Sequence, residues 1–327
     1  MSFHPPRFLR NRHVQSILAS SKLRKLFSKK TAKRLDHASR DVLLPSGGQI
    51  HLHCLVTEHS RQKIEHTRPL VILIHGWEGS ANSTYLHSAA ATLFDNGYDI
   101  IRLHLRDHGP SHHLNTELFH GARIDEVVAA IKSINQQFPR QNTYLTGFSL
   151  GGNFALRIAQ RAKNDNLKLT KVVAISPVIN PIETMKALEN GSALYRTYFM
   201  RKWRKSLVIK HATFPEKVKL AEVKNATNLM ALTEMLVEQH TNFTSVNDYF
   251  NSYTLTGTQL SEIEIPTEII TSQDDPVIPI ADFNTIIKSA NVNIQIHAYG
   301  GHCGFIKNYG LESWVNEELL RQFKTVE

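Results

Sequence analysis

A glycine-flanked serine lies between a strand-like run and a helix-like run of this 327-residue chain. The segment 146–152 reads TGFSLGG, with the strand-like run at 142–145 before it and a helical pattern at 153–162 after it. Glycine on both sides permits a sharp turn, because a Cβ there would crowd the adjoining strand and helix. Such a turn exposes the hydroxyl of Ser149, which needs a nearby base and oxyanion donors to act as a nucleophile. The pattern also arises by chance, so its meaning depends on the rest of the chain.

Two loops that follow later strand-like runs supply the partners that this serine requires. The run at 267–272 is followed by QDDPVIP at 273–279, and the run at 292–298 is followed by YGGHCGF at 299–305. A histidine can take the proton of the serine and return it to the leaving group, while a carboxylate holds the imidazole in the right tautomer. The order serine, acid, histidine is that of the α/β-hydrolases, so we predict that His302 is the base.

Two adjacent aspartates compete for the role of the acid. Asp274 and Asp275 point to opposite sides if the loop is extended. We favour Asp275, because it precedes Pro279 by four positions, which is the usual spacing of the acid loop in this fold. The other carboxylate is then expected to be solvated in a turn. The alternative for His302 is a loop histidine bonded to backbone, which the glycines at positions 300, 301 and 304 disfavour.

An apolar run at 71–74 leads into the loop HGWEGS at 75–80, which forms the second half of the candidate site. A buried strand that ends in a glycine-bearing loop can present backbone N–H groups to a developing oxyanion. We predict that the N–H groups of Trp77 and Leu150 fill this role, in which the side chains matter less. His75 is expected to orient the loop through hydrogen bonds rather than to react or bind metal.

Strand-like and helix-like runs alternate along most of the chain. A hairpin is predicted at 41–44 and 50–56, and helices are predicted at 84–96 and 121–136. The alternation predicts an α/β protein with a mostly parallel, doubly wound sheet, the α/β-hydrolase fold, whose ligands lie at the carboxyl ends of the strands. Residues 180–261 interrupt the alternation, and we interpret them as an inserted, mainly helical cap that sets substrate access. Further strands are predicted at 71–74, 99–104 and 171–175.

The net charge of +9 is concentrated at the amino terminus. Residues 1–40 hold eleven lysines and arginines and one aspartate, a local charge of +10, whereas the remaining residues sum to about −1. We therefore divide the chain into a basic arm at 1–40 and an α/β-hydrolase domain at 41–327. The favoured interpretation is a solubilising arm that packs its apolar residues against the domain. Contact with an anionic membrane surface comes second, and nucleic acid comes last, because no nucleic-acid motif accompanies the charge.

Two segments bear on the membrane alternative. The segment 195–205 interleaves aromatic and basic residues, which suits a lipid–water interface. It also suits a cap helix that covers the pocket with Tyr198, Phe199 and Trp203 while its charges face solvent, and we favour this second interpretation. No signal-peptide pattern and no run of roughly 20 apolar residues is present, so we expect a cytoplasmic protein, peripheral at the membrane at most. The basic arm has an amphipathic cast from Ile17, Leu18, Leu23, Leu26 and Phe27.

Histidines and cysteines give no sign of a metal site or a disulfide framework. Four histidines lie between positions 104 and 113, in a stretch typical of the strand end and loop that border a hydrolase pocket. His104 and His108 are expected to support that loop by hydrogen bonds rather than to bind metal. Cys54 and Cys303 lie far apart and lack metal-ligand spacing. We therefore expect no cofactor and no metal.

Several motifs together resemble those of the YheT-like family of α/β-hydrolases. The resemblance covers essentially the whole chain and implies that Ser149, Asp275 and His302 form the catalytic triad. Two positions depart from the family pattern and border the pocket: Trp77 stands where a leucine is usual, and RDHG at 106–109 replaces the more usual loop. The motifs are NRHVQSI at 11–17, HGWEGS at 75–80 followed by Asn82, Ser83 and Tyr85, FHG at 119–121 with Asp125, GFSLGGN at 147–153, DDP at 274–276 and GHCGF at 301–305.

These patterns predict a serine hydrolase that cleaves carboxylic esters through an acyl-enzyme on Ser149. The expected substrates are esters with short to medium acyl chains or lipid-like esters. Acyl transfer to an alcohol by the same triad is the alternative among enzymes. A non-catalytic protein that binds a lipid surface is a third alternative, which the complete triad disfavours. The expected partner is a small-molecule or lipid-like ester.

Overall fold

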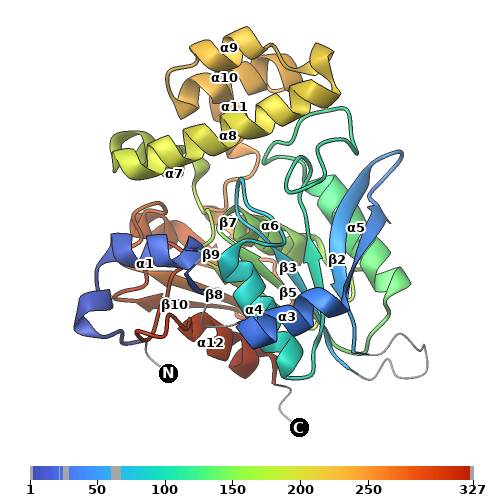
Figure 1. Ribbon diagram of the computed structural model, residues 1–327, viewed down its shortest axis with the longest axis vertical. Helices are drawn as coiled ribbons and strands as arrows, with labels where there is room; N and C mark the ends of the chain where they lie inside the picture. The colour runs from blue at the N-terminus through green and yellow to red at the C-terminus, as the bar shows by residue number, and fades with distance from the viewer. Residues whose placement is uncertain (1–2, 22, 25–28, 60–67, 325–327) are drawn as a thin grey trace.

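The structure is built around an eight-stranded sheet. The computed structural model describes residues 3–21, 23–24, 29–59 and 68–324. The strand order is β1-β2-β4-β3-β5-β6-β8-β10, in which β2 pairs antiparallel with β1 and β4 and the other neighbours are parallel. This mostly parallel sheet confirms the predicted fold class (Figure 1). The strands are β1 (Ser39–Pro45), β2 (His51–Thr57), β3 (Leu70–Ile74), β4 (Asp99–Leu103), β5 (Thr143–Phe148), β6 (Lys171–Ile175), β8 (Thr267–Ser272) and β10 (Val292–His297).

Helices cover both faces of the sheet, and the central strand β3 contributes to both. Successive side chains of a strand point to opposite faces. Ile72 and Ile74 accordingly pack in the apolar core that includes α5 and α6, whereas Val71 and Leu73 pack in the core that includes α4 and α12. A run of apolar residues without polar alternation is thus explained by a strand buried on both sides. The helices are α4 (Thr84–Asp95), α5 (Ile124–Gln137), α6 (Leu150–Arg161) and α12 (Trp314–Phe323).

The amino-terminal segment packs against this body. Its elements are a 3-10 turn at Arg7–Leu9, α1 (Arg12–Ser20) and α3 (Lys29–Ala38). The side chain of Asn11 caps α1 by accepting the N–H groups of the second and third helical residues. Some apolar residues of the segment are buried, as the packing interpretation predicted, but Ile17 and Leu23 are 49% and 56% exposed. Leu26 and Phe27 lie outside the described residues. The buried side chains are Phe3, Leu9, Ala19 and Leu35.

A cap of five helices is inserted after β6 and lies above the body in Figure 1. The last part of the predicted insertion, 180–261, differs from a helical cap, because β7 (Gly257–Leu260) pairs in parallel with β9 (Ile286–Lys288) in a second, two-stranded sheet. The cap helices are α7 (Pro181–Asn190), α8 (Ala193–Thr213), α9 (Leu220–Asn225), α10 (Leu229–His240) and α11 (Val246–Asn251).

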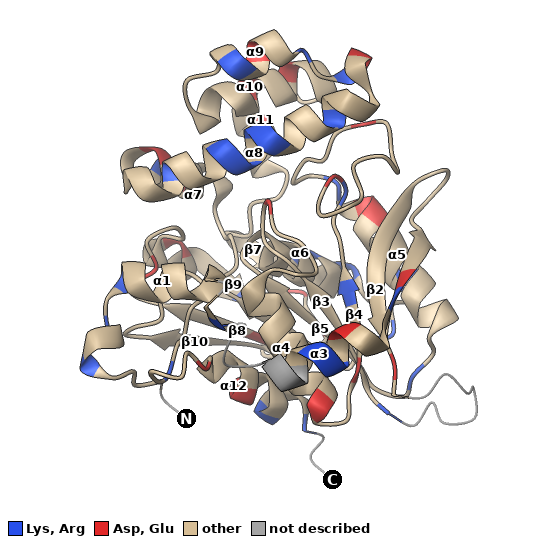
Figure 2. Ribbon diagram, viewed as in Figure 1, with Lys and Arg blue, Asp and Glu red and all other residues tan. Residues whose placement is uncertain are grey.

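The long helix α8 joins the cap to the body through a buried ion pair. Lys210 is 1% exposed, and its ammonium donates to Asp107 Oδ1 at 2.8 Å and to the Asn115 carbonyl at 2.5 Å. His112 and the Ser206 hydroxyl form a second buried link at 2.8 Å. Figure 2 shows the other lysines and arginines spread along α8, where Lys202 and Arg204 donate to the carbonyl groups of Glu78 and Ala226. A buried pair of this kind is costly to break by removing one partner, so it fixes where the cap sits.

Two helices begin at residues other than those the sequence predicted. The helix predicted at 153–162 begins directly after Ser149, at Leu150. The helix predicted at 121–136 begins three residues later, at Ile124.

Within the described residues, no helix combines the length and apolar character needed to cross a membrane.

Candidate active site

Ser149 occupies the strained turn between β5 and α6. Its φ of 55° and ψ of −120° are unusual for a residue with a side chain, and its N–H donates to the Ile175 carbonyl at 2.9 Å. The flanking glycines are required by close packing: a Cβ on Gly147 would lie 2.0 Å from the Gly151 carbonyl oxygen, and one on Gly151 would lie 2.4 Å from the His75 carbonyl oxygen. The turn therefore projects the hydroxyl away from the sheet, as the sequence predicted.

The structure brings three predicted residues together in one hydrogen-bonded chain. His302 Nε2 lies 2.9 Å from Ser149 Oγ, and His302 Nδ1 lies 2.9 Å from Asp275 Oδ2. The second oxygen of Asp275 accepts the backbone N–H groups of Val277 and Ile278 at 2.8 and 3.0 Å. Because one oxygen is fixed by the backbone, the other is held toward the imidazole. Serine, histidine and carboxylate thus have the geometry of a nucleophile, a base and an orienting acid.

Asp274 has a different place from its neighbour. Its Oδ1 accepts the backbone N–H of Gly301 at 2.9 Å. Asp274 therefore supports the backbone of the loop that carries His302. Burial raises the pKa of the Asp274 carboxyl above its ordinary value. The solvated turn carboxylate expected at the second position is therefore a partly buried loop support.

Electrostatics favour a positive charge on His302. Burial is the largest single effect and lowers the pKa of this imidazole, but Asp275 and Cys303 together raise the pKa well above its ordinary value. The Asp275 side chain is fully buried, so its attraction for the imidazolium is weakly screened. A site of this kind stabilises the proton once His302 has taken it.

Trp77 and Leu150, the two predicted oxyanion donors, line the same cavity as Ser149. Trp77 follows Gly76, which approaches the serine so closely that a Cβ there would lie 3.1 Å from Ser149 Cβ. Leu150 is the first residue of α6, so its N–H has no acceptor within the helix and lies at the positive end of the helix dipole. Both residues line a cavity beside Ser149. This placement suits a negative charge that develops on an oxygen there.

Glu78 directly follows Trp77, one of the two predicted oxyanion donors. The residue has a φ of 53°. Burial raises the pKa of its carboxyl to about 8, so the group is mostly protonated at neutral pH. A neutral carboxyl beside Trp77 does not repel an oxyanion. We did not predict this residue, because an isolated glutamate in a loop carries no signal of its burial.

Three buried histidines support the loop 75–81 from below. Burial is the main cause that lowers the pKa of His75 and of His104 to about 3, and it lowers that of His108 well below its ordinary value. Each ring is therefore neutral and presents Nε2 as an acceptor, which confirms the predicted supporting role. The N–H groups they accept belong to Leu105 for His75 (3.2 Å), Ala81 for His104 (3.0 Å) and Glu78 for His108 (3.0 Å).

Helix α1 holds the loop that carries His302. Ser16 Oγ accepts the His302 N–H at 2.8 Å and donates to the Arg12 carbonyl at 2.7 Å. The Gln15 amide donates to the Ile306 carbonyl at 3.1 Å and accepts its N–H at 2.6 Å. These contacts place residues of the basic segment inside the candidate site, which the division at residue 40 did not anticipate. The motif at 11–17 was the signal that could have shown it.

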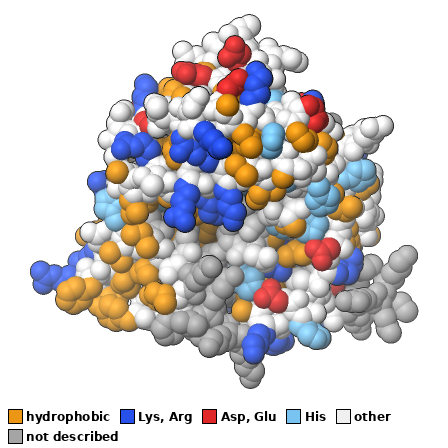
Figure 3. Space-filling model, turned by 45° about the horizontal axis from the view of Figure 1, so that its top comes forward, with side chains coloured by type: hydrophobic (Ala, Val, Ile, Leu, Met, Phe, Trp, Pro, Cys, Tyr) orange, Lys and Arg blue, Asp and Glu red, His pale blue; other side chains and the backbone are white. Residues whose placement is uncertain are grey.

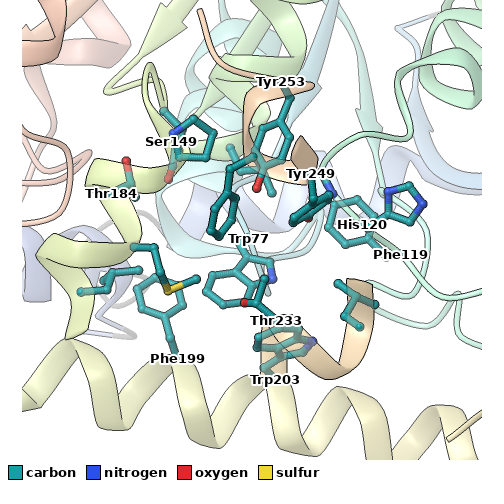
Figure 4. A pocket seen from close by; sticks show the side chains of 18 of the residues that line it. Trp77, Phe119, His120, Ser149, Thr184, Phe199, Trp203, Thr233, Tyr249 and Tyr253 are labelled. Carbon is teal, nitrogen blue, oxygen red and sulfur yellow. The ribbon is translucent and has the colours of Figure 1, made fainter. Parts of the chain in front are cut away.

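Two cavities adjoin Ser149. The inner pocket has a volume of about 90 Å³ and lies between the body and the cap. The outer groove has a volume of about 550 Å³ and runs between α1, the loop 76–80 and α8. Figure 4 shows the inner pocket, whose aromatic walls include Phe119, Trp203, Tyr249 and Tyr253.

Trp77 stands between the two cavities and lines both. Its ring stacks on Phe199 of α8 at 5.2 Å between centroids and meets Trp203 edge-on at 5.0 Å. This contact explains the departure from the usual leucine, because the larger ring reaches the cap. Phe199 and Trp203 cover the pocket as predicted, whereas Tyr198 is 44% exposed.

Across the part of the chain that the structure describes, no three His, Cys, Asp or Glu side chains are grouped to hold a metal ion.

The chain is similar in sequence to proteins of the alpha/beta hydrolase fold. The sequence profile of the alpha/beta hydrolase fold matches residues 69–309. YheT of Escherichia coli (strain K12) is 23% identical over 310 residues, which span 93% of this chain and 87% of that protein. Human phospholipase ABHD3 is 22% identical over 283 residues, which span 85% of this chain and 69% of that protein.

Solved structures share the fold at low identity. Esterase Pf2001 of Pyrococcus furiosus superposes with a TM-score of 0.56 and 17% identity, covering 88% of this chain and 90% of that chain. An esterase of Pyrobaculum calidifontis superposes with a TM-score of 0.54 and 16% identity, covering 98% of this chain and 96% of that chain.

Proposed function

Because the chain belongs to the α/β-hydrolase fold family, as its YheT-like motifs predicted, we propose that it is a serine hydrolase that cleaves carboxylic esters through an acyl-enzyme on Ser149. The observation that carries this proposal is the unbroken chain from Ser149 Oγ through His302 to Asp275, with both contacts at 2.9 Å. Esterases and a phospholipase among the similar proteins support an ester as the bond cleaved.

Acylation begins when His302 Nε2 takes the Ser149 proton as the oxygen attacks the ester carbonyl carbon. The carbonyl oxygen becomes an oxyanion beside the N–H groups of Trp77 and Leu150, an interaction that contributes several kcal/mol to typical acyl transfer enzymes. Asp275 stabilises the imidazolium and holds its tautomer. When the ester C–O bond breaks, His302 returns the proton to the alkoxide, and the alcohol leaves with the acyl group on Ser149.

Deacylation repeats these steps with water. His302, neutral again, takes a proton from a water molecule that attacks the acyl carbon, and the same two N–H groups face the new oxyanion. Breakdown returns the proton to Ser149 Oγ and releases the acid. Acyl transfer differs only in that an alcohol replaces water, so it is the alternative outcome of the same acyl-enzyme.

A fluorophosphonate probe tests the proposal directly. We expect covalent labelling at Ser149, located by peptide mass spectrometry, and release of acid from p-nitrophenyl butanoate. The matched control is Ser149→Ala, which should abolish labelling and reduce turnover by about 10⁴-fold or more. Turnover by Ser149→Ala at the wild-type rate would refute the acyl-enzyme, and a wild-type protein that neither labels nor turns over would indicate the binding-protein alternative. Product analysis in the presence of ethanol separates hydrolysis from acyl transfer.

A lipid-like ester and peripheral contact with an anionic membrane remain part of the proposal. Exposed apolar side chains support it at Ile17 and Leu23 of the amino-terminal segment, which are 49% and 56% exposed. Because Gln15 and Ser16 hold the His302 loop, deleting the segment would disturb the site as well. Ile17→Ser with Leu23→Ser is the cleaner test. Loss of co-sedimentation with phosphatidylserine vesicles is expected, and unchanged co-sedimentation would exclude this contact.

A further inference from the structure

His302 distinguishes the two cavities that meet at Ser149. The imidazole lines the outer groove, and it is absent from the lining of the inner pocket. Leu150, whose N–H faces the developing oxyanion, lines the inner pocket alone. Trp77 and Phe199 stack on each other and line both spaces, so their rings lie where the two spaces adjoin. A substrate attached to Ser149 must therefore divide its parts between an aromatic-walled pocket and a groove that contains the acid–base group.

The chemistry of the tetrahedral intermediate decides which part lies where. Its central carbon, bonded to Ser149 Oγ, carries an oxyanion, an acyl chain and the oxygen of the leaving alcohol. The oxyanion points to the backbone donors. The leaving oxygen must come within hydrogen-bond reach of His302 Nε2, because that nitrogen returns the proton. The alcohol therefore extends into the outer groove, and the inner pocket is left for the acyl chain.

We propose, on the premise of the function proposed above, that the substrate is an ester of a short-chain acid with a much larger, largely apolar alcohol. The inner pocket of about 90 Å³ is smaller than a cavity of about 150 Å³ that holds benzene, so by proportion it accommodates about four carbon atoms. The outer groove of about 550 Å³ falls in the range of roughly 300–1,000 Å³ that holds ligands of drug size.

The lining of the outer groove indicates the character of the alcohol. Leu194 and Tyr198 of α8 face Ile17 of α1 across it, and these side chains are 50%, 44% and 49% exposed. Lys202 also lines the groove, near the Tyr198 ring. Figure 3 shows hydrophobic and basic side chains together on this side of the molecule. An apolar alcohol that reaches the surface covers the exposed apolar groups.

Two ester series measure the preference on each side of the scissile bond. In the first, the alcohol is p-nitrophenol and the acid is acetate, butanoate or octanoate. In the second, the acid is acetate and the alcohol is ethanol, hexanol or dodecanol. We expect kcat/KM to fall at least tenfold from butanoate to octanoate and to rise with alcohol length. The opposite pattern, or no dependence in either series, would overturn the proposal.

Matched variants assign each preference to its cavity. Leu236→Ala enlarges the inner pocket and is expected to raise the octanoate-to-butanoate ratio of kcat/KM by about tenfold, a typical effect of a changed apolar contact. Leu194→Ala, in the outer groove, should change only the alcohol series. If Leu236→Ala does not fold, Met185→Ala on α7 enlarges the same pocket. A change of acyl preference in Leu194→Ala and not in the inner variants would reverse the assignment.

Fluorophosphonate labelling separates this inference from the function on which it rests. If Ser149 is labelled and the specificity is reversed, the cavity assignment alone is wrong. If Ser149 is not labelled and no ester is cleaved, the proposed function itself is wrong.

Discussion

Histidines lie on both sides of Ser149, and the two sides hold them in opposite charge states. Below the loop 75–81, burial lowers the pKa of His75 and His104 to about 3, so the rings are neutral. On the other side, burial also lowers the pKa of His302, but Asp275 and Cys303 together raise it well above its ordinary value. The same residue type thus serves as a fixed acceptor in one place and as a proton carrier in the other.

The difference lies in the partners rather than in burial. His104 has His53 as a neighbour at 2.8 Å. Burial lowers the pKa of His104 most, and His53, His108 and Arg102 lower it further, against the smaller raising effect of the His53 carbonyl. His302 faces a carboxylate at 2.9 Å whose side chain is fully buried. A low dielectric strengthens whichever interaction is present. The charge state of a buried histidine therefore depends on the charge of the side chains that contact it.

The two loops also differ in what supports them. Loop 75–81 rests on His104 and His108, which follow strand β4 directly and lie 23 and 30 positions from the residues whose N–H groups they accept. The loop of His302 rests on Ser16, which is 286 positions away. The first support comes from residues close in the chain that follow a neighbouring strand. The second requires α1 to pack against the main body of the fold.

Asp275→Asn should have the largest effect, because it removes the only carboxylate bonded to His302 among the described residues. We expect kcat to fall by about 10³- to 10⁴-fold, as loss of the orienting acid does in other serine hydrolases. Asp274→Asn is the matched control, since an amide oxygen can still accept the Gly301 N–H, and it should lower kcat by about tenfold at most. Steady-state kinetics on p-nitrophenyl butanoate measure both. A larger loss in Asp274→Asn would exchange the roles of the neighbours.

Acidification should reduce activity, through His302, at a higher pH than it reduces stability, through His75 and His104. His302 must be neutral to take the serine proton, so kcat/KM should rise with pH through a limb above 6.5 and fall about tenfold for each unit below it. The lowered pKa of His75 and His104 has the opposite consequence for folding: their neutral form stabilises the protein above the ordinary histidine pKa, and this stability is lost as pH falls toward about 3.

Activity and unfolding measured across the same pH series separate these effects. We expect activity to disappear while the protein is still folded, and unfolding in denaturant to become easier only at lower pH. The raised pKa of His302 contributes its own stabilisation below the ordinary histidine pKa, which is lost as pH rises through the folded value. A kinetic limb at or below 6.5, or one that coincides with unfolding, would contradict the charge states described above.

The sequence was sufficient to predict those parts of the fold and site that arise from local patterns. The strand at 171–175 was predicted with the bounds that the structure has, since an apolar run between polar turns leaves little freedom. The spacing from Asp275 to Pro279 selected the aspartate that the structure places against His302. Glycines around Ser149 report packing distances that only a tight turn produces.

The parts that depend on distant contacts were not predictable in the same way. A basic segment reads as an arm because charge dominates its composition, whereas its burial depends on a few residues such as Phe3 and Gln15. The side chain of Trp77 was assigned little importance, because its stacking on Phe199 requires the position of the cap. Strand β7 was included in the cap, since its partner β9 follows only after another strand of the main sheet.

His108→Ala tests the support on the neutral side. It leaves the N–H of Glu78 and the carbonyl of Arg106 without their buried partner. Each buried group left unsatisfied costs about 1–3 kcal/mol, so we expect the free energy of unfolding to fall by about 2–4 kcal/mol and kcat by about tenfold. His113→Ala, an exposed histidine of the same segment, should change the stability by about 0.5 kcal/mol at most. Equal stabilities of the two variants in urea would show that His108 does not support the loop.

Ser16→Ala tests the support on the charged side and should have the smallest effect. The His302 N–H loses its acceptor, but the side chain keeps its bonds to Ser149 and Asp275, so we expect kcat to fall by about threefold to tenfold with KM nearly unchanged. The ascending limb of the pH profile should move toward lower pH, because a looser loop weakens the contact of His302 with Asp275, and Ser16→Thr should restore both. Ser133→Ala is the control, since it also removes a hydroxyl that donates to a backbone carbonyl. If Ser16→Ala and Ser133→Ala share one pH profile, α1 covers the histidine loop without positioning it.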